Sequence, residues 1–152
     1  MRFTVPSTLA SAADYVDVGG WTPAVWQHVT AVFNAGTFTV YRNAVAVAGT
    51  VNGTIPATLT SGSVQGTEIG GVAGSVLASV NLAHMMIWTG QALTAPQVVE
   101  LYNSAIPRDP RALSFAAPSN YWPLQGTYED LGTAATRNLL PYGTVTFESS
   151  AP

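Results

Sequence analysis

Short stretches of alternating apolar and polar residues, interrupted by Gly, Asn and Pro about every ten positions, run along most of the chain. The clearest unit spans residues 25–51, in which alternate residues from Val29 to Phe33 share one face of a predicted strand. Phe38 and Val40 share one face of the returning strand, and Asn34–Gly36 supplies residues that tolerate positive φ. The pattern predicts a β-hairpin here and an all-β sandwich or barrel for the chain.

Two later segments depart from simple alternation. The run from Leu82 to Trp88 is apolar on both faces, so we expect it to be the most deeply covered strand. In "LTAPQVVELYN", Thr94 is a good N-cap, Pro96 falls in the first turn, and Gln97 stands three residues after the cap. These signals predict one helix from Ala95 to Tyr102, docked against the sandwich through its apolar side.

The segments "WQHVTAVFNAGTFTVYRNAVAV", "EIGG" and "MMIWTGQALTAPQVVELYN" follow one another between Trp26 and Asn103. In this order they resemble the laminin-G-like, concanavalin A-like jelly rolls, and "DYVDV" at Asp14–Val18 resembles an earlier strand of such domains. The resemblance implies an all-β fold: a two-sheet antiparallel jelly-roll sandwich with one short helix near residues 95–102. It implies no single function, because the fold occurs in lectins, glycosidases, adhesion modules and virion proteins.

The chain departs from the family pattern at several positions. Family members often carry an Asp-Gly turn where this chain has Asn43-Ala44, and an acidic pair in the last strand where it has Ala83-His84-Met85. Only "GGWTPAV" separates the "DYVDV" strand from the hairpin, whereas relatives insert another strand and loop. The first third of an ordinary member is therefore not in its usual place.

The C-terminal part of the chain resembles the opening of such a domain. "NYWPLQG", followed by "EDLGTAATRNLLPYGTVTF", is similar to the family's first strand, first loop and next strand. We therefore predict a single domain over residues 1–152, arranged as a circular permutant in which strands within 120–147 complete the sandwich. The alternative is that Ile106–Pro118 is a linker to a tail that adds a strand to a neighbouring subunit.

Composition favours a surface that meets other proteins. Of the 152 residues only 9% are charged, and mean hydropathy is +0.24. The five basic residues are all Arg and the net charge is −3, so nucleic-acid binding is not expected. The chain has no run of about 20 apolar residues, so no membrane insertion is expected. Cysteine is absent, so there is neither a disulfide framework nor a thiolate metal site.

No catalytic residue is predicted. Glycosidases of related fold need two carboxyl groups that project into one groove. Glu129 and Asp130 are adjacent and would point apart in a strand, while Asp14 and Asp17 have opposite parity. His28 and His84 lie in predicted strands, and each is interpreted as a partly buried histidine with its hydrogen bonds satisfied. We therefore predict that the protein is not an enzyme.

No metal or cofactor is assigned either. Calcium needs six to eight oxygen ligands, and the best donors here are Asp130, Glu129 and Asn120 with loop carbonyls between Gly126 and Asn138. The favoured interpretation of this acidic pair is a solvated loop, with a structural ion as the alternative.

A sugar platform would need exposed aromatic rings. Trp21, Tyr128 and Tyr142 lie in predicted loops or at their edges. Trp26, Trp88 and Trp122 fall within predicted strands and are interpreted as core residues. Trp21 is thus the one tryptophan that we select as a candidate contact.

These observations predict a non-enzymatic structural protein, a phage virion surface subunit (capsid decoration or cement) that binds neighbouring subunits and forms oligomers. The alternative is a carbohydrate-binding, lectin-like module in an extracellular location. The loop "IPRDPRALSFAAP" is expected to be extended and stiff, with the guanidinium groups of Arg108 and Arg111 directed at carboxylates of a neighbour. The predicted interface residues are therefore Trp21, Arg108 and Arg111.

Overall fold

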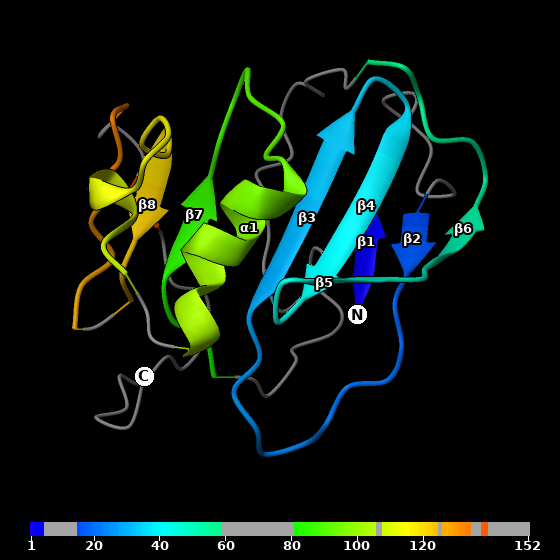
Figure 1. Cartoon of the computed structure of the whole chain (residues 1–152), viewed down its shortest axis with the longest axis horizontal. Helices are drawn as coiled ribbons and strands as arrows, with labels where there is room; N and C mark the ends of the chain where they lie inside the picture. Colours follow the sequence, from blue (N-terminus) through cyan, green and yellow to red (C-terminus); the bar gives the residue numbers. More distant parts are fainter. Residues whose placement is uncertain (5–14, 59–80, 106–107, 125, 135–137, 140–152) are drawn as a thin grey trace.

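The computed structural model describes residues 1–4, 15–58, 81–105, 108–124, 126–134 and 138–139. These residues form antiparallel strands with a single α-helix and two short 3-10 turns, so the predicted all-β class is confirmed (Figure 1). The strands are β1 (Arg2–Thr4), β2 (Tyr15–Asp17), β3 (Val29–Asn34), β4 (Thr37–Arg42), β5 (Val45–Val47), β6 (Thr50–Asn52), β7 (Met85–Ile87) and β8 (Asn120–Trp122). The helix is α1 (Ala95–Tyr102), and the 3-10 turns span Asn103–Ala105 and Pro110–Ala112. Hydrogen bonding groups the strands as β1-β2-β6, β3-β4-β5 and β7-β8.

The β3-β4 hairpin is formed as the sequence predicts. Phe33 pairs with Phe38 and Asn34 with Thr37, which leaves Ala35-Gly36 as a two-residue loop. Both loop residues have positive φ, 45° and 85°, as expected for a turn that matches the twist of the strands.

A first apolar core lies between the β1-β2-β6 sheet and one face of the β3-β4 hairpin. Val16, Val18 and Val40 are each only 2% exposed, and partly buried side chains surround them. The ring of Phe3 from β1 packs against that of Phe38 from β4 with centroids 5.6 Å apart. This contact between two sheets is the sandwich part of the fold.

A second core lies on the opposite face of the hairpin, where α1 covers it. Leu93, Val98 and Leu101 are buried there against Val32 of β3 and Met86 of β7, and Figure 1 shows α1 lying over these strands. The two faces of β3-β4 therefore serve different cores, as the alternation of side chains along a strand requires.

Local signals determine the bounds of α1, which agree with the prediction. Gln97 Oε1 accepts a hydrogen bond from the Thr94 backbone N–H at 2.8 Å, which forms the glutamine half of a capping box. At the other end Asn103 adopts the left-handed conformation with φ 43°, a common way to end a helix.

Strands β7 and β8 pair antiparallel, with Met86 opposite Tyr121. All three residues of β8 are buried, whereas those of β7 are only half-buried, so the prediction that 82–88 is the most deeply covered strand is wrong. His84 has a φ of 53° and breaks the extended backbone before Met85, and Leu82, which precedes it, is 45% exposed.

The C-terminal segment around β8 thus lies beside β7 of the same chain. The second C-terminal strand of the prediction, around residues 143–147, lies outside the described residues. The single domain over residues 1–152 and its circular permutation stay predictions, as does the alternative of a tail donated to a neighbour.

Candidate functional site

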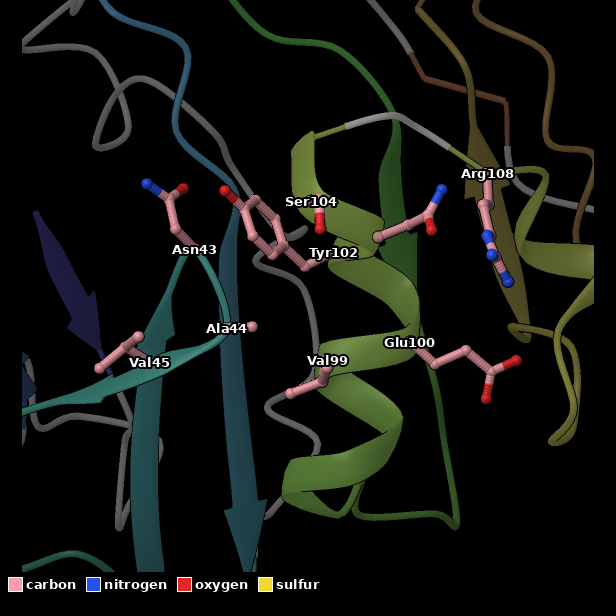
Figure 2. A pocket seen from close by; sticks show the side chains of 9 residues that line it. Asn43, Ala44, Val45, Val99, Glu100, Tyr102, Ser104 and Arg108 are labelled. Atoms are coloured by element: carbon pink, nitrogen blue, oxygen red, sulfur yellow. The ribbon is translucent and has the colours of Figure 1, made fainter.

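A surface depression of about 490 Å³ lies between α1 and the turn that joins β4 to β5 (Figure 2). Its floor and sides come from three places in the sequence: the β4-β5 turn, the outer face and C-terminal end of α1, and the segment after the helix. We call it the α1 depression, and its lining residues are Asn43, Ala44, Val45, Val99, Glu100, Tyr102, Asn103, Ser104 and Arg108.

The β4-β5 turn forms one wall of the α1 depression. Asn43 and Ala44 both have positive φ, 49° and 63°. Asn43 is tied to the start of β3, because its Oδ1 accepts from the His28 N–H and its own N–H donates to the His28 carbonyl, both at 2.9 Å. The left-handed conformation costs a non-glycine residue roughly 1–2 kcal/mol, but the methyl group of Ala44 packs against the core beneath α1. Glycine at this position would lack that apolar contact.

The other wall carries opposite charges. Glu100 accepts hydrogen bonds from the Ser114 hydroxyl and from the Ser114 N–H, the latter at 2.7 Å. The Ser114 hydroxyl, the Ser114 N–H and then the positive charge of Arg108 lower the pKa of Glu100 below its ordinary value, so the group is a carboxylate at neutral pH. Arg108 is exposed and forms no ion pair with any residue that the structure describes.

Apolar side chains lie exposed between these walls. Val99 on α1 is 55% exposed and Val45 on β5 is 66% exposed, and Figure 2 shows Val99 on the helix and Val45 on the strand that follows the β4-β5 turn. Single exposed valines are ordinary, but two that line one hollow add apolar surface to a lining that is otherwise mostly polar.

His28 does not line the α1 depression but contacts Tyr102, which does. Its ring packs against that of Tyr102 with centroids 5.7 Å apart, and its buried Nδ1 has no hydrogen-bond partner among the described residues. The expectation that His28 is fully satisfied is therefore wrong, and burial lowers its pKa below the ordinary value. The same expectation is confirmed for His84, which is half-buried with its Nδ1 2.9 Å from the Tyr121 hydroxyl.

The depressed pKa of His28 predicts loss of stability in acid. The unfolded chain binds a proton near the ordinary pKa of about 6.5, and the folded chain binds it only at lower pH. The free energy of unfolding should therefore decrease as the pH falls below the unfolded value, until the folded pKa is reached. Urea unfolding at about pH 8 and about pH 5 would measure this difference, and His28→Gln should reduce it. An unchanged pH dependence in His28→Gln would contradict the assignment.

A second polar cluster joins β8 to the loop that follows it. Asp130 is only 6% exposed, and its Oδ1 accepts from the Tyr121 and Gly132 N–H groups, both at 2.9 Å. Its Oδ2 accepts from the Asn120 side-chain amide at 2.5 Å. Gly132 lies so close that an added Cβ would be 2.5 Å from Asn120 Cα, so the loop needs glycine here.

The prediction that the Glu129-Asp130 pair is a solvated loop is wrong for Asp130. This carboxylate is buried and accepts hydrogen bonds from three N–H groups. Glu129 is exposed, as predicted. Both carboxylate oxygens of Asp130 face N–H groups, which identifies a structural role for it. The described residues contain no group of three or more His, Cys, Asp or Glu side chains placed to hold a metal ion.

Comparison with known families agrees with this architecture. Residues 1–99 match the family model described as the concanavalin A-like lectin/glucanases superfamily. The chain belongs to this superfamily. No curated protein and no solved structure matches the chain. The resemblance to laminin-G-like and concanavalin A-like jelly rolls is thereby confirmed, and the match includes the first 25 residues, which the sequence motifs left largely unassigned.

In this concanavalin A-like domain, Trp21 contributes to the first core. It is half-buried, its indole N–H donates to the Val18 carbonyl at 2.6 Å, and the Arg42 guanidinium lies over its ring at 5.7 Å. Arg42 in turn donates to the Gly19 carbonyl at 3.2 Å. These contacts within the chain give Trp21 a role in the fold, and its role at an interface stays a prediction.

The exposure of Trp26 was not predicted. Trp26 is 41% exposed, and the prediction that it is a core residue of a strand is wrong, because β3 begins only at Val29. Val25 beside it is 58% exposed. The turn-forming Pro23 shortly before these residues was the available signal that the strand starts later.

The two predicted interface arginines are not brought together. Arg108 lines the α1 depression, whereas Arg111 binds Asp109 through Nε–Oδ1 at 2.8 Å and Nη2–Oδ2 at 2.6 Å and lies over the Tyr121 ring at 6.0 Å. The loop is not extended at this point, since Pro110–Ala112 forms a 3-10 turn capped by Asp109. The Asp109 carboxylate thus binds the Arg111 guanidinium, which was expected to face a carboxylate of a neighbour.

Tyr128 is half-buried and Tyr142 lies outside the described residues, so a sugar platform built on these two rings stays a prediction. None of the helices in the described ranges is long and apolar enough to cross a membrane.

Proposed function

We propose that this domain is a non-enzymatic binding module that attaches to protein subunits of a larger assembly, as a capsid decoration or cement protein on the surface of a phage virion. The observation that carries the proposal is the α1 depression, whose lining combines the exposed side chains of Val45 and Val99 with polar residues and a pair of opposite charges. Jelly rolls serve as capsid proteins as well as lectins, so the fold is compatible with this role.

The organisation of the depression resembles that of a protein interface. Interfaces have an apolar centre depleted in charge and a polar rim. Here two exposed valines supply apolar surface, and polar or charged residues such as Asn43 and Arg108 make up most of the remaining lining. The whole chain is also poor in charged residues, at 9%, which fits a protein much of whose surface is covered by neighbours.

The proposal of a non-enzymatic role rests on the acidic groups. Hydrolysis of a glycosidic bond needs two carboxyl groups about 5–9.5 Å apart with free oxygens. Glu100 is the one carboxylate among the described lining residues, and Ser114 already donates to both of its oxygens. Asp130, the buried carboxylate near β8, is likewise occupied by N–H donors.

Replacing Arg108 should test the interface. Arg108→Ala is expected to weaken binding to capsids prepared without this protein by about tenfold, measured by co-sedimentation, and to leave the melting temperature unchanged because Arg108 is exposed. Arg111→Ala is the matched control, since its guanidinium is already engaged by Asp109. Equal loss of binding in both variants would contradict a specific role for Arg108. Failure of the unmodified protein to bind capsids, or release of reducing sugar from a glucan panel, would refute the proposed function.

A second candidate function, carbohydrate binding, is favoured by the Tyr102 ring and the amides of Asn43 and Asn103 in the same depression. An aromatic face beside amide groups suits a pyranose ring and its hydroxyls. Nuclear magnetic resonance titration with oligosaccharides would support this function if shifts clustered at the depression and disappeared in Tyr102→Ala.

A further inference from the structure

We propose that the partner at the α1 depression is a second copy of this chain, docked across a two-fold axis so that Arg108 of each copy faces Glu100 of the other. The inference rests on the proposed function, because it assigns a partner to the same surface. It differs in predicting self-association of the purified chain without any other subunit.

The first step is the pairing of charges. A two-fold interface brings the same patch of both copies together, so each contact occurs twice, with the roles of the two copies exchanged. A patch of one sign would repel itself in that arrangement, whereas the α1 depression carries one carboxylate and one guanidinium close enough for Arg108 to lower the pKa of Glu100. The patch is therefore electrostatically complementary to itself.

Glu100 and Arg108 differ in how firmly contacts within their own chain hold them. Glu100 is fixed by Ser114 from the other side, so its position is set before any partner arrives. Arg108 is exposed and has no ion-pair partner among the described residues. Its guanidinium can donate charge-assisted hydrogen bonds to a carboxylate, and Glu100 of a second copy supplies one whose two oxygens each keep a lone pair beyond the bond from Ser114.

The third step is apolar contact. Val99 and Glu100 both line the depression, so a copy docked over it to pair the charges also covers Val99. Val45 borders the same hollow, and both valines are more than half exposed in the single chain. Their burial would supply the apolar centre, and the charge pairs would set the register.

The test is sedimentation velocity of the full chain over the micromolar range. The unmodified protein should show reversible dimerisation, and Val99→Asp should weaken it at least tenfold by placing two carboxylates near the axis. Val51→Asp is the matched control, because Val51 on β6 is 53% exposed and does not line the depression. A monomeric unmodified protein, or equal weakening by Val99→Asp and Val51→Asp, would overturn the inference.

Charge reversal tests the register. Arg108→Glu and Glu100→Arg should each be monomeric alone, because each makes the patch a single sign. An equimolar mixture of the two variants should form a heterodimer, since opposite patches then face each other. Two monomeric variants that stay apart when mixed would contradict the cross-copy pairing.

The outcome separates this inference from the proposed function. A chain that is monomeric but still co-sediments with capsids would overturn self-association and leave the capsid role intact. A chain that dimerises through Val99 but does not bind capsids would support self-association and refute the capsid role.

Discussion

A chain that ends at Pro118 is expected to lose cooperative folding. It lacks β8, whose Tyr121 and Trp122 are only 5% and 4% exposed, and it leaves β7 without its hydrogen-bonded neighbour. Burial of each large side chain is worth roughly 1.5–3 kcal/mol, and a domain has about 5–15 kcal/mol of stability in total. The open edge of β7 should also promote aggregation.

Thermal melting followed by near-ultraviolet circular dichroism would measure this loss. A chain that ends at Leu139 is the control, because it keeps β8 and Asp130 and so isolates the contribution of residues 140–152. A Pro118 truncation that stays soluble, melts cooperatively and keeps its aromatic spectrum would show that β8 is dispensable. That result would support the alternative in which the C-terminal segment serves a neighbouring subunit.

Asp130→Ala is expected to destabilise the protein by about 3–5 kcal/mol, because it leaves buried donors of Asn120, Tyr121 and Gly132 without an acceptor. Asp130→Asn should cost less, since an amide oxygen can still accept from the two backbone N–H groups while its NH₂ faces the amide of Asn120. Urea unfolding would measure the difference in the free energy of unfolding.

Asp109→Ala is the matched control for this prediction. Asp109 also accepts several hydrogen bonds, but its ion pair with Arg111 is exposed, with side chains 46% and 48% accessible. Exposed ion pairs contribute about 0–1 kcal/mol. If the Asp130 and Asp109 variants lost the same small amount of stability, the structural role that we assign to Asp130 would be wrong.

The candidate site was only partly visible in the sequence. Arg108 was selected because of its loop, and the structure places it at the α1 depression. Val99 was not singled out, and nothing in the sequence showed that α1 would share a depression with the turn at Asn43 and Ala44. Trp26 was assigned to the core although it is exposed, because the motif that contains it suggested a strand that actually begins at Val29.

What the sequence by itself determined was local or periodic. The bounds of α1 follow from the contact between Thr94 and Gln97, and the hairpin follows from Ala35-Gly36 and from alternation along β3 and β4. These features depend on residues a few positions apart, whose interactions are nearly the same in any fold.

The tertiary structure decided the features that join distant segments. Asp130 is buried where it accepts from the Tyr121 N–H of β8, Nδ1 of His28 has no partner among the described residues, and Arg111 lies over the Tyr121 ring. The tertiary structure also formed the α1 depression from the β4-β5 turn and a helix some 50 residues later in the chain. A sequence pattern gives the character of each side chain, but burial and partnership depend on which segments pack together, and that is settled only when the whole core forms.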